Sequence, residues 1–154
     1  SINRALETVP DNEPFCYFGK DVVFDSAWLT YAELCFNKHY PTGLGLISFK
    51  DDIVDGGNAS HGMTTKRWLE VLYGYNHFPL DYFHWFCDSE LTVRSKDFGR
   101  YTFCADSYVA HKHEPSGHTG KPNQPDDYLT QNARHVEWAN GGKREAEARL
   151  RAIQ

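Results

Sequence analysis

The sequence predicts a mixed α/β fold in a single domain, and three observations support this class. Short apolar and aromatic runs alternate with segments whose apolar residues recur at helical spacing. Glycine and proline residues separate these segments and so delimit the expected elements. The 154 residues are 40% hydrophobic and 15% aromatic, which suffices for one core but is short for two independent domains.

The first half of the chain is expected to hold two strands and two helices. The aromatic run at 14–18 is typical of a buried strand, and it stops at Gly19. The elements that follow are a helix that Asp25 or Ser26 caps and that carries Trp28 and Leu29, a strand at 43–49, a loop at 50–63, and a helix from Thr64 or Thr65 to Gly74.

The second half is expected to add one strand and three helices. These elements are a helix from about Asp88 to Gly99, a strand at 101–110, a polar Gly/Pro loop at 114–125, and helices at about 126–139 and 143–153. Residues 1–114 are therefore expected to form the core. Residues 115–154 are expected to form a loop and helices that pack on it.

Composition and charge exclude several classes of protein. The chain has 16 basic and 21 acidic side chains, a net charge of −5, and no polybasic run, so nucleic acid is not an expected partner. No stretch approaches the ~20 apolar residues that span a bilayer, so no transmembrane segment is expected. The cysteines stand singly, without a C-x-x-C pair, which indicates free thiols and a cytoplasmic location. They are Cys16, Cys35, Cys87 and Cys104.

An aspartate at the end of the first expected strand is a candidate metal ligand. Asp21 leaves the end of that strand, at the sheet edge where open α/β sheets bind their ligands. Mg²⁺ and Mn²⁺ prefer oxygen ligands and are commonly held by one or two carboxylates together with substrate phosphates. The alternative interpretation is that Asp21 and Asp25 are turn and cap residues.

A second acidic pair, Asp88 and Glu90, lies where an aromatic segment becomes a helix. A carboxylate at a helix start, walled by Tyr82, Trp85 and Phe86, can act as a general base whose pKa is tuned by burial. The alternative is that both acids only complement the dipole of the helix in its first turn.

Two histidines mark the end of the last expected strand. Alternation along a strand puts His111 and His113 on one face, where they could hold a metal ion. A surface pair without a ligand is the alternative, and His118 in the following loop is expected to be solvated.

Six segments follow one another in a fixed order: Asn3-Arg4-Ala5-Leu6, Lys20-Asp21, Asp88-Ser89-Glu90-Leu91 with Arg94, Gly99, Ala105-Asp106 and Val109-Ala110-His111. Over most of residues 1–114 this order resembles the second half of a family-2 glycosyltransferase. The resemblance implies a GT-A type mixed sheet flanked by helices. The N-terminal nucleotide-binding part of that fold is expected to be missing from this sequence.

The resemblance also implies a role for each candidate. Asp21 corresponds to the final, metal-ligating Asp of the DxD motif, and His111 completes the shell of a Mn²⁺ or Mg²⁺ ion. Asp88 corresponds to the catalytic base, supported by Glu90 and Arg94. All three of Asp21, Asp88 and His111 are then expected to line one cleft.

Two positions depart from the family pattern. Gly19 stands where the first Asp of DxD is expected, and Cys87 replaces the usual acid before the base. With fewer charged ligands, metal affinity is expected to be low. The 154 residues alone are expected to bind a nucleotide-sugar weakly or not at all.

The expected activity is metal-dependent, inverting transfer of a sugar from a nucleotide-sugar donor to a hydroxyl of a glycan or another acceptor. The loop at 50–63 and the aromatic segment at 76–85 are expected to form the acceptor side, because aromatic faces suit sugar rings. The candidate acceptor contacts are His61, Trp68 and Trp85.

Two other functions are open from the sequence. One is a non-catalytic carbohydrate-binding or structural remnant of the same fold, which Gly19 favours. The other is a metal-dependent hydrolase that uses His111, His113 and Asp88, which needs a further ligand that the sequence does not show. Clustering of Asp21, Asp88 and His111 around one cleft would favour transfer, and their dispersal would favour the non-catalytic remnant.

Overall fold

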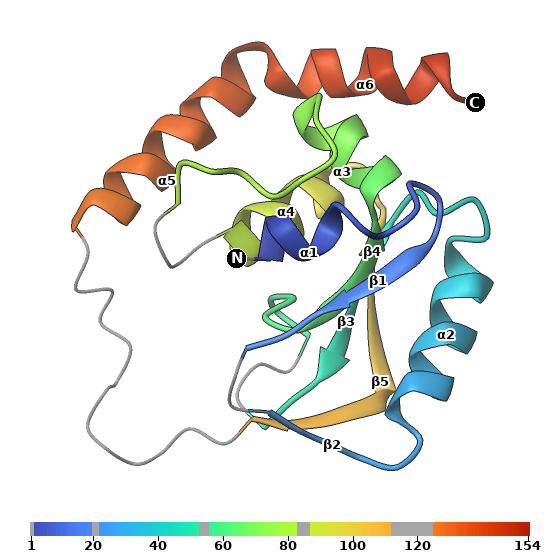
Figure 1. Cartoon of the computed structure of the whole chain (residues 1–154). Coiled ribbons are helices and arrows are strands. Elements are labelled where there is room, and N and C mark those ends of the chain that lie inside the picture. The colour runs from blue at the N-terminus through green and yellow to red at the C-terminus, as the bar shows by residue number, and fades with distance from the viewer. Residues whose placement is uncertain (1, 20–21, 53–55, 83–86, 112–124) are drawn as a thin grey trace.

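The computed structural model describes residues 2–19, 22–52, 56–82, 87–111 and 125–154, and it confirms the mixed α/β class. A curled five-stranded sheet carries helices on both faces (Figure 1). In chain order the elements are α1 (Ile2–Leu6), β1 (Pro14–Tyr17), β2 (Val22–Phe24), α2 (Trp28–His39), β3 (Leu46–Lys50), β4 (Gly62–Thr65), α3 (Lys66–Tyr73), α4 (Cys87–Asp97), β5 (Tyr101–His111), α5 (Pro125–Glu137), the π-helical segment η1 (Trp138–Gly142) and α6 (Lys143–Ala152).

The strands lie in the order β1-β4-β3-β5-β2. Within this sheet β3 and β5 run parallel, while β1 with β4, β3 with β4 and β2 with β5 are antiparallel. Two of these strands were not expected from the sequence. β2 has only three residues, and β4 lies partly in the expected loop at 50–63, with the sequence Gly-Met-Thr-Thr.

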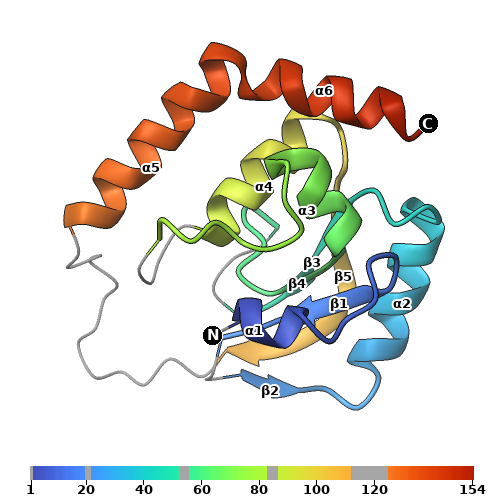
Figure 2. The ribbon, with the colours of Figure 1, turned by 45° about the horizontal axis from the view of Figure 1, so that its top comes forward.

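The sheet divides the core into two layers because its central strand is buried on both faces. Leu46 of β3 packs in the layer under α3 and α4, and the next residue, Ile47, packs in the layer under α2. Both side chains are fully buried. Figure 2 shows α2 on one side of the sheet, with α3, α4 and the C-terminal helices on the other. This double coverage explains why 46–49 is a continuous apolar run broken only by a serine.

Capping residues in the sequence mark both ends of α3, but none marks the start of α2. The Thr65 hydroxyl accepts a hydrogen bond from the Trp68 backbone N–H at 3.1 Å, and Gly74 ends α3 in the left-handed conformation at φ 79°, as expected. The expected cap of α2 by Asp25 or Ser26 is wrong. The N-cap residue is Ala27, which makes no side-chain cap.

The C-terminal helices close over the face that carries α3 and α4 (Figure 1). The Trp138 ring is buried against Phe98, and its indole N–H donates to Asp97 at 2.8 Å. From α6, Arg149 donates to the carbonyl of Val71 in α3 at 2.8 Å. Among the helices described, none has the length and apolar character needed to cross a membrane.

Candidate functional site

Asp88 lies in the first turn of α4, where that helix meets the loop before β4. The Asn58 side-chain amide donates to Asp88 Oδ2 at 2.9 Å and to Ser89 Oγ at 3.2 Å. Asp88 is half-buried, and the contacts with Asn58 orient its carboxylate. The sequence placed this carboxylate at a helix start, and the structure agrees.

The loop that carries Asn58 is itself fixed to α4. The Thr92 hydroxyl donates to the Asp88 carbonyl at 2.8 Å and accepts the Ala59 backbone N–H at 2.9 Å. The Ala59 carbonyl in turn accepts from the Tyr17 hydroxyl of β1 at 2.8 Å. The position of Asn58 beside Asp88 is therefore determined by the sheet as well as by the helix.

Burial raises the pKa of the Asp88 carboxyl above its ordinary value. The backbone N–H of Ser89 and the amide of Asn58 oppose this change, because both donate to the charged form, but burial dominates. A partly desolvated carboxylate with a raised pKa, held in one orientation, is suited to accept a proton from a bound hydroxyl.

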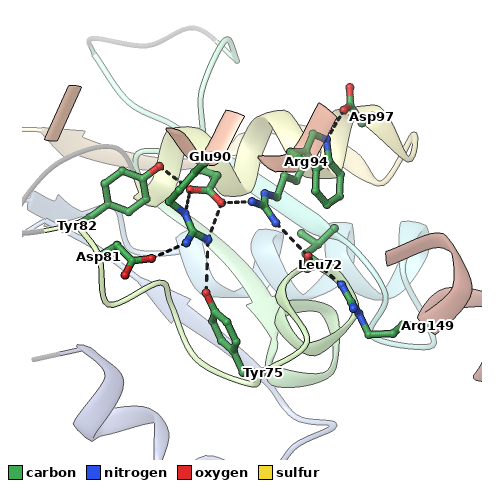
Figure 3. A network of polar contacts seen from close by, with 10 residues as sticks. Leu72, Tyr75, Asp81, Tyr82, Glu90, Arg94, Asp97 and Arg149 are labelled. Carbon is green, nitrogen blue, oxygen red and sulfur yellow. Dashed lines mark hydrogen bonds and ion pairs between the residues drawn. The ribbon is translucent and has the colours of Figure 1, made fainter. Parts of the chain in front are cut away.

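Glu90 supports the helix and is not available as a second base. It is 9% exposed, its Oε1 lies 2.7 Å from Arg94 Nη2, and its Oε2 accepts from Arg134 Nε at 2.6 Å. The Tyr82 hydroxyl donates to the same carboxylate. Figure 3 shows this group between α4 and the segment that carries Asp81 and Tyr82.

Arg94 is a structural residue as well. It is 5% exposed, it donates to the Leu72 carbonyl at 3.1 Å, and its guanidinium lies over the rings of Tyr73 and Trp138. The role that the sequence gave Glu90 and Arg94, support of the base, is compatible with these contacts. They hold the helix that presents Asp88.

Of the three expected acceptor contacts, two are buried and the third is not described. Trp68 is fully buried and donates its indole N–H to Ser95 at 2.9 Å, so its ring has no face for an acceptor and belongs to the core. His61 is 2% exposed, and its Nδ1 accepts the Gly19 N–H at 3.2 Å. Its Nε2 lies 3.9 Å from Asp51, which is also buried. Trp85 lies outside the described residues.

Of the two expected metal ligands, the structure describes only the backbone of His111. Asp21, His113 and His118 lie outside the described residues, and for His111 the backbone alone is described. In the antiparallel pair of β2 and β5, Val22 lies opposite His111. Within the described part of the chain, no group of three or more His, Cys, Asp or Glu side chains is arranged to hold a metal ion. The shared cleft of Asp21, Asp88 and His111 therefore stays a prediction.

Two residues of this region were missed in the sequence. Asn58 lies 30 residues from Asp88, and Arg134 lies 44 residues from Glu90. An asparagine in a polar loop and an arginine in an amphipathic helix carry no local sign of a buried partner, so no signal in the sequence points to either contact.

Comparisons with known proteins give this chain no relative. No family model, no curated protein and no solved structure matches it.

Proposed function

We propose that this chain is the metal-binding and acceptor side of a nucleotide-sugar-dependent glycosyltransferase of the GT-A type, which transfers a sugar to an acceptor hydroxyl with inversion. The observation that carries the proposal is Asp88. It is a half-buried carboxylate at a helix start, oriented by Asn58, and burial raises its pKa. An inverting transfer needs one such base to take the proton of the acceptor hydroxyl.

The sheet register supports a metal site where β2 and β5 pair. Val22 follows Asp21 in the sequence and pairs with His111, so the start of β2 and the end of β5 lie side by side. A carboxylate and an imidazole fit Mn²⁺ or Mg²⁺, with the donor's phosphates as the remaining ligands. Asp21 and His111 would hold the ion, and the ion would supply positive charge against the departing diphosphate.

In the proposed reaction Asp88 is ionised when the acceptor binds. Its carboxylate accepts the proton as the acceptor oxygen bonds to the sugar carbon, and the nucleoside diphosphate leaves with the electrons of the broken bond. Asn58 holds the carboxylate in place, and the network of Glu90, Arg94 and Arg134 holds the helix that carries it.

The test is Asp88→Asn in a preparation that transfers sugar from a nucleotide-sugar with Mn²⁺. We expect transfer to fall by about 10²–10⁴-fold, while donor binding by calorimetry stays nearly unchanged, because a general base acts on the acceptor. Asp21→Asn should instead weaken donor binding and transfer together. Glu145→Gln is the matched control, because this carboxylate is exposed on α6, outside the segments of the proposed site. Normal transfer by Asp88→Asn would remove the main support for the proposal.

The stability of Asp88→Asn separates a catalytic carboxylate from a structural one. Because the folded-state pKa is raised, the folded chain binds this proton more tightly than the unfolded chain does. The ionised group therefore lowers stability at neutral pH, and stability recovers as the pH falls through the folded-state pKa. Asp88→Asn should be at least as stable as the parent at pH 7. A purely structural acid in the first helical turn would instead lose about 0.3–1 kcal/mol on this substitution.

A further inference from the structure

A hollow of about 320 Å³ lies at the C-terminal end of α2 and shares no lining residue with the Asp88 site. Three segments form it: the end of α2 with the turn that follows, the residues around the start of β1, and the first turn of α3 (Figure 1). They come together because Pro14, the first residue of β1, pairs with Thr65, the residue before α3. The volume falls within the range of small-molecule sites, which begins at about 300 Å³.

The floor of the hollow is aromatic and is fixed by the core. Phe36 and Tyr40 are buried, and their rings pack edge to face at 5.8 Å. The Tyr40 hydroxyl shares a hydrogen bond of 2.8 Å with the Thr102 hydroxyl of β5. The Gly43 N–H donates to the Tyr40 carbonyl at 2.8 Å, and the Gly43 carbonyl accepts the Thr65 hydroxyl at 2.7 Å. The hollow is therefore preformed, which lowers the cost of binding a ligand there.

Arg67, in the first turn of α3, is the cation among the residues that line this hollow. It is half-buried, and its guanidinium has no ion pair or hydrogen bond with any residue that the structure describes. The Asp11 carbonyl accepts the Arg67 backbone N–H at 3.2 Å, but the Asp11 carboxylate pairs with Lys66 at 3.0 Å. Two further acids close in the sequence, Glu13 and Glu70, are exposed and do not pair with Arg67 either. The guanidinium therefore keeps its N–H donors for an added acceptor.

Neutral polar groups and the charges at the end of α2 complete the surroundings. The C-terminal carbonyls of a helix carry partial negative charge, and Lys38 and His39 in the last turn of α2 offset it. Amides and a hydroxyl on the lining residues can each donate and accept hydrogen bonds, and their side chains make no hydrogen bond within the described ranges. They belong to Asn12, Asn37 and Thr42, with the rings of Pro14 and Pro41 beside them.

We propose that this hollow binds a small organic anion, whose carboxylate or phosphate group binds Arg67 and whose ring lies on the aromatic floor of Phe36 and Tyr40. A guanidinium donates two parallel hydrogen bonds to either anionic group, and a neutral amide cannot accept them with the same strength. The apolar surface accommodates the ring, while a single charged group sets its orientation. This site is independent of the proposed sugar transfer, and its test needs no transfer activity.

The test uses the whole chain and four probes: benzoate, phenyl phosphate, the neutral benzamide, and inorganic phosphate. Binding is followed by ¹⁵N–¹H NMR on the groups that line the hollow, namely the Arg67 Nε–H, the side-chain amides of Asn12 and Asn37, and the Gly43 N–H. We expect saturable shifts with benzoate or phenyl phosphate at concentrations up to about 10 mM. Benzamide and inorganic phosphate should bind at least about tenfold more weakly, because each lacks either the charge or the ring.

The two ring anions distinguish the possible ligands. Tighter binding of benzoate would assign a carboxylate ligand, and tighter binding of phenyl phosphate would assign a phosphate monoester. Three results would overturn the proposal: no saturable shift with either ring anion, benzamide binding as tightly as benzoate, or inorganic phosphate binding as tightly as phenyl phosphate.

Arg67→Gln separates the charge from the fold. Since the guanidinium has no partner in the described part of the chain, the melting temperature should stay within about 2 °C of the parent. Affinity for the preferred ring anion should fall at least about tenfold. Arg151→Gln, on the exposed end of α6, is the matched control and should bind as the parent does. Unchanged affinity in Arg67→Gln, or an equal loss in the control, would show that Arg67 does not hold the anion.

Discussion

At the scale of single residues, Asn58 decides how Asp88 is presented. Its amide donates to the carboxylate at 2.9 Å and also reaches the hydroxyls of Ser89 and Ser60. A donor to the charged form of an acid lowers the pKa of that acid, so Asn58 limits the increase that burial causes. The residue therefore tunes the candidate base as well as orienting it.

Asn58→Ala should raise the pKa of Asp88 further, because burial then acts with one fewer opposing hydrogen bond. The measurement is a carboxyl ¹³C NMR titration of the folded chain, which needs no substrate. Ser60→Ala is the matched control, since the Ser60 hydroxyl contacts Asn58 and shows no contact with Asp88 among the described interactions. An unchanged or lowered Asp88 titration in Asn58→Ala would show that this hydrogen bond does not set the pKa.

At the scale of elements, an arginine of α5 binds a buried acid of α4. Arg134 donates to both oxygens of Glu90 at 2.6 and 3.0 Å and pairs with Asp81 at 2.6 Å. The carboxylate of Glu90 is buried and also pairs with Arg94, so this is a charged network with two cations at one buried acid. A pair of this kind is costly to break, because the remaining charge stays desolvated.

Arg134→Ala should destabilise the chain by about 2–3 kcal/mol. This is less than the ~3–5 kcal/mol of a fully orphaned buried charge, because Arg94 still pairs with Glu90 and Arg134 is partly solvated. The measurement is urea unfolding at two salt concentrations. Arg151→Ala on exposed α6 is the control and should stay within about 0.5 kcal/mol of the parent. Equal effects of the two substitutions would argue against the network.

At the scale of the whole molecule, one aromatic residue joins the C-terminal helices to the core. The Trp138 side chain is buried against Phe98, lies under the Arg94 guanidinium, and donates to Asp97. It belongs to the same apolar cluster as Trp68 of α3. The helices after residue 124 are therefore expected to unfold together with the sheet.

Trp138→Ala should cost about 3–5 kcal/mol and lower the melting temperature of the whole chain by about 10 °C or more. Circular dichroism and the fluorescence of the remaining tryptophans should report one shared transition. Leu129→Ala removes a side chain of α5 that is 67% exposed, and it should leave the transition nearly unchanged. Two separate transitions in the parent would mean that the C-terminal helices form their own folding unit.

Elements with local signals could be predicted from the sequence. The helix between Thr65 and Gly74 has its cap and its left-handed end within the segment itself, and the strand at 101–111 is rich in β-branched and aromatic residues. β2 and β4 could not be found in this way. The three residues of β2 form a strand only because β5 supplies their hydrogen bonds. The Gly-Met-Thr-Thr segment of β4 forms a strand only because it lies between β1 and β3.

The candidate site also has features that the sequence predicted and features that only the fold decided. The sequence by itself determined that Asp88 begins a helix, because the signal lies within a few residues. Only the tertiary structure decided that Asn58 orients this carboxylate, that Glu90 is occupied by two arginines, and that Trp68 belongs to the core. The contacts of Asn58 with Asp88 and of Arg134 with Glu90 join residues that are distant in the chain. Packing alone creates such contacts, so they leave no periodic or local trace in the sequence.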